Sequence, residues 1–286
     1  MKKGFTLVEL LIVVVVMGVL ILMLLPAIQS VREAARKTTC RNNMKNVLIA
    51  TINYHSSFGR YPVGVGRRPD NVDRNHTFIT TWAGQIAPHI EESRFDAGSC
   101  ICSKRNRDAM KNPSSVYLCP SMPADEKLVT YQDEHHSPFL ARSTHIHPPG
   151  GLGGQLSQFL NNGKTLIRDN GEKGEKNVPD GLTSTIAYTE TTGPSSYKHG
   201  QIVPGLVEGG SAYLPGTSFT AIDNNFHLNR TPETGGMNAY TNHQNNLLTV
   251  GFIGGNVGDI RDGIDLEVYA RLLITNDAKV ISSDFF

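Results

Sequence analysis

The sequence predicts an α+β protein in which one long N-terminal helix packs on an antiparallel β-sheet with long loops. The chain begins with a long apolar stretch, and a stripe of apolar residues at helical spacing continues to about residue 58. Short segments rich in β-branched residues then follow, separated by turns. A helix followed by a run of strands is the element order of α+β domains.

The apolar stretch is long enough to cross a membrane. Residues 10–30 contain no charged side chain, and about 20 apolar residues span the ~30 Å hydrocarbon core of a bilayer. A secretory signal peptide has a shorter apolar core, about 7–15 residues, and no acid at its head. Here Glu9 stands at the head, where an ionised carboxylate costs on the order of 3 kcal/mol unless it is paired. We therefore expect residues 5–30 to form a transmembrane helix whose acid has a partner.

The helix is expected to continue beyond the membrane. Apolar side chains recur every three or four positions over residues 31–58, which makes one stripe that can lie on a sheet. Gly59 and Pro62 are typical of a helix end. A kink or a melted turn is expected at Pro26, because proline removes one backbone hydrogen bond.

The remainder of the chain is predicted to form strands and loops. Residues 128–131, 185–189 and 247–253 have the β-branched and aromatic content of strands. The Pro- and Gly-rich stretch 148–154 predicts a connector, and the polar stretch 161–180 predicts an exposed loop. We therefore expect residues 59–286 to form a loop-rich globular domain.

The composition argues against several classes of protein. A net charge of +1, without a lysine- and arginine-rich stripe between aromatics, gives no basis for nucleic-acid binding. The sequence contains no nucleophile elbow, zinc-protease helix, phosphate-binding loop or dinucleotide fingerprint. No catalytic residue is assigned, and we do not expect an enzyme.

The four cysteines are Cys40, Cys100, Cys102 and Cys119. Their spacing does not supply the paired units of a tetrahedral zinc site, and disulfides form readily outside the cytoplasm. A Cys40–Cys119 bond would join the helix to the globular domain and contribute about 2–4 kcal/mol, with free thiols as the alternative. Cys100 and Cys102 are too close for an unstrained mutual bond, and the sequence assigns them no partner.

Two clusters contain side chains that can bind metals. One consists of the histidines His135, His136, His145 and His147. The other consists of Asp259, Asp262 and Asp265, candidate calcium ligands that lack the spacing of a helix–loop–helix calcium site. A solvated loop or turn is the simpler interpretation of each cluster, so we expect no cofactor, with structural calcium as the alternative.

The N-terminus carries a family resemblance. Residues 4–9, Gly-Phe-Thr-Leu-Val-Glu, followed by an apolar helix, resemble the leader of type IV prepilins and type II secretion pseudopilins. In that family a membrane-embedded prepilin peptidase cuts after the glycine and methylates the new N-terminus. The resemblance implies a leader at residues 1–4, cleavage between Gly4 and Phe5, and methylation of Phe5. It also implies that Glu9 pairs with the N-terminal amine of a neighbouring subunit, which supplies the partner that the buried acid requires.

The rest of the chain resembles a bacterial pseudopilin-like family with a domain of unknown function. The matching stretches run in order at residues 32–36, 40–45, 54–62, 81–82, 86–91, 116–121 and 180–186, and from His243 onwards. That family ends with a histidine, nine residues and then Asp-Gly in a hairpin. From His243 the spacing reaches Ile253-Gly254 or, with one extra residue, Gly254-Gly255, so the aspartate is absent. Gly-Gly still permits a tight turn, but any role of the carboxylate is lost, and a hydrogen-bonded residue at a strand start is the simpler interpretation of His243.

The resemblance implies a structural subunit of a type IV pilus or of a type II secretion-like pseudopilus. Its partners would be prepilin peptidase, the inner membrane and other pilin or pseudopilin subunits, and its globular domain would be periplasmic or extracellular. The alternatives are an anchored binding module that does not polymerise, and an anchored hydrolase.

The charges that flank the apolar stretch argue against this orientation. Two lysines precede the stretch, whereas five cations follow it: Arg32, Arg36, Lys37, Arg41 and Lys45. Cytoplasmic flanks usually carry the excess of lysine and arginine. We give precedence to the leader motif, which resembles one that is processed on the cytoplasmic face.

Overall fold

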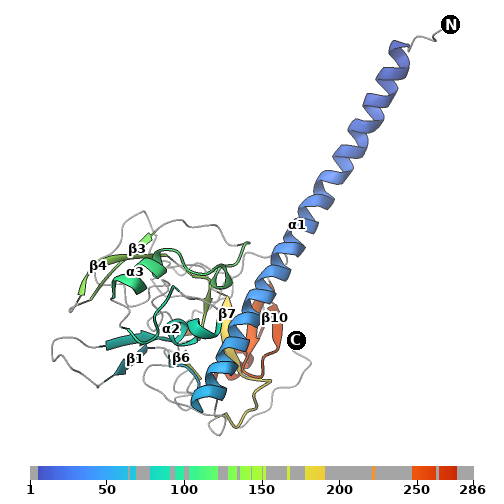
Figure 1. The fold of residues 1–286 in the computed structure, drawn as a ribbon. Coiled ribbons are helices and arrows are strands. Elements are labelled where there is room, and N and C mark those ends of the chain that lie inside the picture. Colours follow the sequence, from blue (N-terminus) through green and yellow to red (C-terminus); the bar gives the residue numbers. More distant parts are fainter. Residues whose placement is uncertain are drawn as a thin grey trace.

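The structure, a computed structural model, shows one long helix projecting from a globular domain of short strands and helices (Figure 1). It describes residues 6–63, 65–68, 78–90, 94–99, 103–121, 128–133, 136–142, 144–149, 151–152, 166–167, 178–190, 221–222, 247–261 and 264–275. The long helix and a four-stranded antiparallel sheet confirm the predicted α+β, pilin-like class.

Helix α1 spans Leu7–Phe58 without a break. Thr6 caps its first turn, and Gly59 ends it in the left-handed conformation at φ 69°, donating its N–H to the carbonyl of His55 at 2.7 Å. A glycine adopts this conformation without the steric penalty of a side chain. The helix also continues through Pro26, so the melted turn was wrong, and the kink, which was the other expectation, stays a prediction. Only one hydrogen bond is lost there, and the backbone bonds on either side keep the helix intact.

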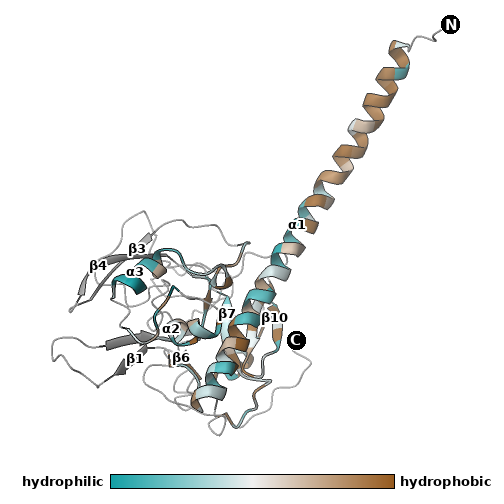
Figure 2. Cartoon of the chain, in the orientation of Figure 1, coloured by the Kyte–Doolittle hydropathy of each residue, from teal (hydrophilic) through white to brown (hydrophobic). Residues whose placement is uncertain are grey.

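The two parts of α1 have different surroundings. The distal part is almost uniformly apolar and extends away from the globular domain, whereas the proximal part mixes polar and apolar residues (Figure 2). Residues 31–39, which we expected to begin the buried stripe, are exposed or partly exposed. The buried face begins nearer the domain and consists of Cys40, Met44, Val47, Leu48, Ala50, Thr51 and Tyr54.

The central sheet has the strand order β10-β9-β7-β5, and its paired neighbours are antiparallel. Its strands are β5 (Ile146–His147), β7 (Ile186–Glu190), β9 (Leu247–Phe252) and β10 (Val257–Arg261). Strands β7 and β9 coincide with two of the three predicted strand segments. Successive side chains of a strand point to opposite faces of the sheet, and both faces of this sheet are buried. One face packs in the same core as α1, and the other packs with helix α5 (Leu266–Leu273).

The helix lies very close to the sheet at Gly251 on β9. A Cβ atom at that position would lie 2.9 Å from both Leu48 Cδ1 and Met44 Sδ. Real Cβ atoms essentially never approach so closely, so a larger residue here would force the Met44 and Leu48 side chains of α1 to shift.

The remaining described elements of the domain are short. Three two-stranded sheets pair β1 (Val65–Arg68) with β2 (Phe78–Thr81), β3 (Leu128–Asp133) with β4 (His136–Arg142), and β6 (Gly151–Leu152) with β8 (Ala221–Ile222). The short helices are α2 (Trp82–Ile86), η1 (Ala87–Ile90), α3 (Lys104–Lys111) and η2 (Ser115–Tyr117). The third predicted strand segment lies in β3, and β6 falls within the stretch predicted as a connector. Most of the predicted loop 161–180 lies outside the described residues.

Candidate functional site

The acid at the head of α1 is bound by the residue that caps the helix. Glu9 Oε2 accepts hydrogen bonds from the backbone N–H of Thr6 at 2.9 Å and from its hydroxyl at 2.7 Å. The backbone N–H of Glu9 donates in turn to Thr6 Oγ1 at 3.3 Å. This reciprocal capping box satisfies two of the N–H groups that a helix start leaves open. Glu9 therefore has a partner within its own chain, which the sequence did not lead us to expect.

The segment that follows Glu9 has the properties of a membrane span. By length and composition, α1 is the one helix among the described residues that is long and apolar enough to cross a bilayer, and its apolar segment is not buried in protein. Gly4 and Phe5, the residues at the expected cleavage point, lie outside the described part of the chain.

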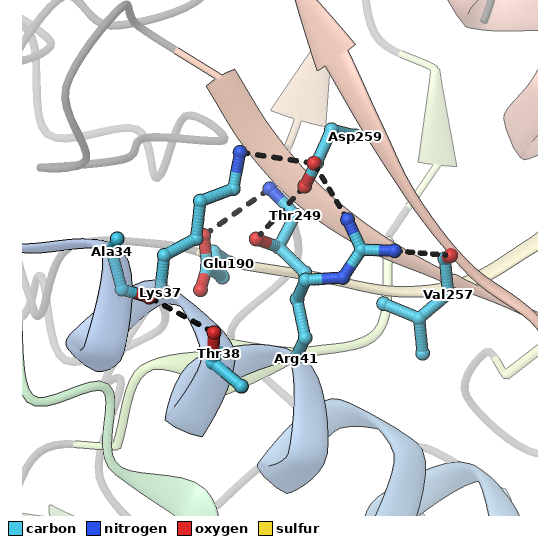
Figure 3. A network of polar contacts seen from close by, with 8 residues as sticks. All are labelled: Ala34, Lys37, Thr38, Arg41, Glu190, Thr249, Val257 and Asp259. Atoms are coloured by element: carbon cyan, nitrogen blue, oxygen red, sulfur yellow. Dashed lines mark hydrogen bonds and ion pairs between the residues drawn. The ribbon is translucent and has the colours of Figure 1, made fainter.

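A cluster of charges joins α1 to strand β10 (Figure 3). Lys37 Nζ and Arg41 Nη1 lie 2.9 and 2.8 Å from Asp259 Oδ2. Arg41 Nη2 also donates to the carbonyl of Val257 at 3.3 Å. These contacts tie two successive turns of the helix to one strand.

The same cluster extends across the sheet to strand β7. The Thr249 hydroxyl donates to Asp259 Oδ1 at 3.4 Å, and the Thr249 N–H donates to Glu190 Oε2 at 3.2 Å. Glu190 is only 1% exposed, so its carboxylate lies inside the domain. The polar contacts thus run from the helix surface into the core (Figure 3).

The turn between β9 and β10 is a second attachment point for α1. Lys45 Nζ donates to the carbonyl of Gly255, and a Cβ on Gly255 would lie 3.1 Å from Ile52 Cδ1. Gly255 has φ 89°, and Gly254 donates its N–H to the carbonyl of Leu182 at 2.7 Å. Gly254 and Gly255 therefore form the hairpin turn, which lies between α1 and the loop that precedes β7. His243 lies outside the described residues.

A disulfide forms the third attachment point. Cys40 on α1 is bonded to Cys119, with 5.1 Å between their Cα atoms and a separation of 79 positions in sequence. The Glu190 carboxylate and the two sulfurs lie within 4.8 Å of one another. Because the two sulfurs are bonded to each other, they are not available as thiolate ligands. Cys100 and Cys102 lie outside the described part of the chain.

Two of the three candidate calcium ligands, Asp259 and Asp265, lie among the described residues, and each contacts groups of the protein. Asp259 binds two of the cations of α1, whereas Asp265 caps helix α5 and accepts hydrogen bonds from the N–H groups of Glu267 and Val268 at 2.8 and 3.2 Å. Asp262 is outside the described residues. Both described aspartates of this set thus have structural partners within the protein, and structural calcium stays an untested alternative to the expected absence of a cofactor.

Two of the four candidate histidines are described with their side chains, and both are buried in the domain. The Nδ1 atom of His145 accepts the N–H of Cys119 at 3.0 Å. His147 Nε2 lies 2.8 Å from the Thr144 carbonyl, and burial lowers the pKa of His147 to about 4. A neutral, buried ring bonded to the backbone fits a structural role. His135 and the side chain of His136 are not described.

Sequence reasoning missed the attachment of the cations to the domain. From the sequence, Lys37, Arg41 and Lys45 were interpreted as cations that flank the span, and no partner was predicted for them. Their spacing of four residues along one face of α1 was the available signal. Their partners near residue 257 are more than 200 positions away, and no local pattern connects them.

Two known sequence families match parts of the chain. A family described as "Protein of unknown function (DUF1559)" matches residues 29–261, and the prokaryotic N-terminal methylation motif matches residues 1–25. No curated protein and no solved structure matches the chain. The first match spans well over half of the sequence, and the second covers the leader and most of the apolar segment. The chain therefore belongs to the DUF1559 family and, with its methylation motif on a long apolar helix, is a type IV pilin- or pseudopilin-like protein.

Proposed function

We propose that this protein is an assembling structural subunit of a type IV pilus or of a type II secretion-like pseudopilus. The observation that carries the proposal is the distal part of α1, an exposed apolar rod with one acid, Glu9, at its head. Leu10, Leu20 and Leu24 are 55–57% exposed. Apolar surface on this scale requires a cover. Lipid covers it in the membrane-held subunit, and the equivalent helices of other subunits cover it in a fibre.

Cleavage and methylation of the N-terminus would create the amine that pairs with Glu9 during assembly. The methylation motif implies cleavage by prepilin peptidase, which we place between Gly4 and Phe5, with methylation of the new Phe5 amine. The described hydrogen bonds from Thr6 to the Glu9 side chain both use Oε2. A carboxylate has about four acceptor positions on its two oxygens, so capping leaves room for the amine of a neighbouring subunit. The capping box would hold Glu9 while the subunit is alone in the membrane, and the neighbour's amine would neutralise it in the fibre.

The proposal places the globular domain outside the cytoplasm. A disulfide between helix and domain suits an oxidising compartment. Three of the five cations behind the span bind the domain, so their number reflects the attachment of α1 as well as membrane topology.

Substitution of Glu9 tests the proposal. Glu9→Leu removes the charge while keeping the segment apolar, and Val8→Leu is the matched control on the adjacent residue. We expect Glu9→Leu to stay in the membrane but to disappear from sheared fibres and from cross-linked oligomers in isolated membranes. Val8→Leu should behave like the wild type. If Glu9→Leu assembles as well as the wild type, the acid does not drive assembly, and an anchored module that does not polymerise through this helix becomes the better account.

A further inference from the structure

The cations on the proximal part of α1 fall into two groups. Lys37, Arg41 and Lys45 bind the globular domain. Arg32 and Arg36 are the first two cations after the apolar segment, and both are exposed. Residues four apart leave a helix on the same side, with about 5–6 Å between their Cβ atoms. Arg32 and Arg36 therefore form a small basic surface, separate from the cations that hold the domain.

Among the described residues, one carboxylate, that of Glu33, forms an ion pair with this basic surface. Within the part of the chain that the structure describes, Arg32 makes no ion pair. Arg36 lies 3.6 Å from Glu33, and its side chain is 55% exposed. Glu33 in turn accepts a hydrogen bond of 2.7 Å from the Ser121 hydroxyl, which ties that carboxylate to the globular domain. An exposed pair of this kind contributes little to stability, so both guanidinium groups remain available to an external anion.

The position of the basic surface along α1 matches the polar layer of a membrane. At 1.5 Å per residue, the helix from Glu9 to Arg32 is about 35 Å long, slightly more than the ~30 Å hydrocarbon core. Arg36 lies about 6 Å farther along, and the headgroup layer of one leaflet is about 5–7 Å thick. With Glu9 near one edge of the core, the backbone of Arg32 lies within the headgroup layer on the other side, and that of Arg36 lies a few Å beyond it. Side chains of a helix tilt toward its N-terminus, so the long Arg36 side chain can extend back to the headgroups. Arg41, about 13 Å beyond Arg32, is past this layer and contacts the domain instead.

We propose that Arg32 and Arg36 bind the phosphate groups of anionic lipids in the leaflet nearest the globular domain. Guanidinium groups donate paired hydrogen bonds to phosphate, and their geometry suits it better than that of lysine. This inference rests on the membrane-held state of the proposed function. The bound lipids set the height of the globular domain above the membrane before the subunit enters a fibre.

The test uses the full-length protein with phosphatidylglycerol as the probe. Retained lipid is counted by native mass spectrometry from detergent, with phosphatidylcholine as the neutral comparison. An attraction of the usual size for a basic residue at an anionic surface corresponds to about 5-fold for each arginine, and about 30-fold for both. We therefore expect Arg32→Gln/Arg36→Gln to lose about 30-fold in preference for phosphatidylglycerol, and Arg32→Lys/Arg36→Lys to keep most of it. Lys104→Gln, which removes an exposed cation at the start of α3, should match the wild type.

Vesicle flotation separates this inference from the proposed function. All variants should float with vesicles, because the apolar segment is unchanged; if the wild type does not float, the anchored state itself is wrong. The inference is overturned if the double glutamine variant inserts normally and still prefers phosphatidylglycerol. It is also overturned if Lys104→Gln loses the preference to the same extent. A double glutamine variant that binds lipid normally but no longer assembles would show that a neighbouring chain, not lipid, occupies the surface.

Discussion

The charge cluster at Asp259 should hold α1 on the sheet, and its loss should measurably loosen the domain. Asp259→Asn keeps the shape of the side chain and removes the charge that binds Lys37 and Arg41. A hydrogen bond to a charged group contributes about 1.5–3 kcal/mol when it is shielded, and an exposed pair contributes about 0–1 kcal/mol. The Lys37 and Asp259 side chains are 20% and 19% exposed, whereas that of Arg41 is 44% exposed. We therefore expect about 1.5 kcal/mol from Lys37 and well under 1 kcal/mol from Arg41, about 2 kcal/mol in all.

The free energy of unfolding of the full-length protein in detergent, measured with urea, checks this value. Trp82 is the one tryptophan of the chain and is 1% exposed, so its fluorescence reports on the core. A double-mutant cycle of Lys37→Gln with Asp259→Asn should give a coupling energy of about 1 kcal/mol. The same cycle on Lys111 and Asp108, a more exposed pair on α3, should give less than about 0.5 kcal/mol. A coupling energy at Asp259 no larger than this control would refute the reasoning.

Three further perturbations have defined outcomes. The folded pKa of His147 is about 4, lowered from 6.5 by burial, so the unfolded chain binds more protons between these values. Stability should fall by about 3 kcal/mol as the pH drops from about 6.5 to about 4, and His147→Gln should flatten this dependence. Gly255→Ala places a side chain at φ 89° and 3.1 Å from Ile52 Cδ1, so the unfolding free energy should fall by about 1–3 kcal/mol. Cys40→Ser removes the bond to Cys119 and should cost about 2–5 kcal/mol in urea unfolding.

Each of these perturbations has a control. Gly18→Ala adds a methyl group where no atom lies within 4 Å, and it should leave the unfolding of the globular domain unchanged. Mild reduction of the wild type should reproduce the loss seen in Cys40→Ser and should have no further effect on that variant. A pH dependence that persists in His147→Gln, or a Gly255→Ala variant as stable as the wild type, would contradict the corresponding account.

The periodic parts of this fold could be predicted because their signal is local. The apolar segment, the helical continuation and strands β7 and β9 each follow from the spacing of apolar and β-branched residues within a short window. The failures at Pro26 and over residues 31–39 have physical causes. One missing hydrogen bond does not break a long helix, and an apolar stripe does not show how far the domain that covers it extends.

The attachment of α1 to the domain could not be predicted because it is made by residues far apart in sequence. From its sequence neighbours alone, Asp259 was a candidate calcium ligand. Its partners in the structure are cations on α1, near the other end of the sequence. The sequence shows the acidic and basic side chains but not which of them meet. The antiparallel pairing of β9 and β10 is what places Asp259 beside α1. The Cys40–Cys119 pair was easier to anticipate, because one cysteine lay on the expected helix and the other in the expected domain.

The mass of the N-terminal peptide of protein extracted from membranes tests the central claim most directly. Prepilin-type processing predicts a chain that begins at Phe5 and carries one added methyl group on its amine. A chain that still begins with its two lysines, or one that begins beyond Leu25, would contradict assembly through the acid-bearing end of α1.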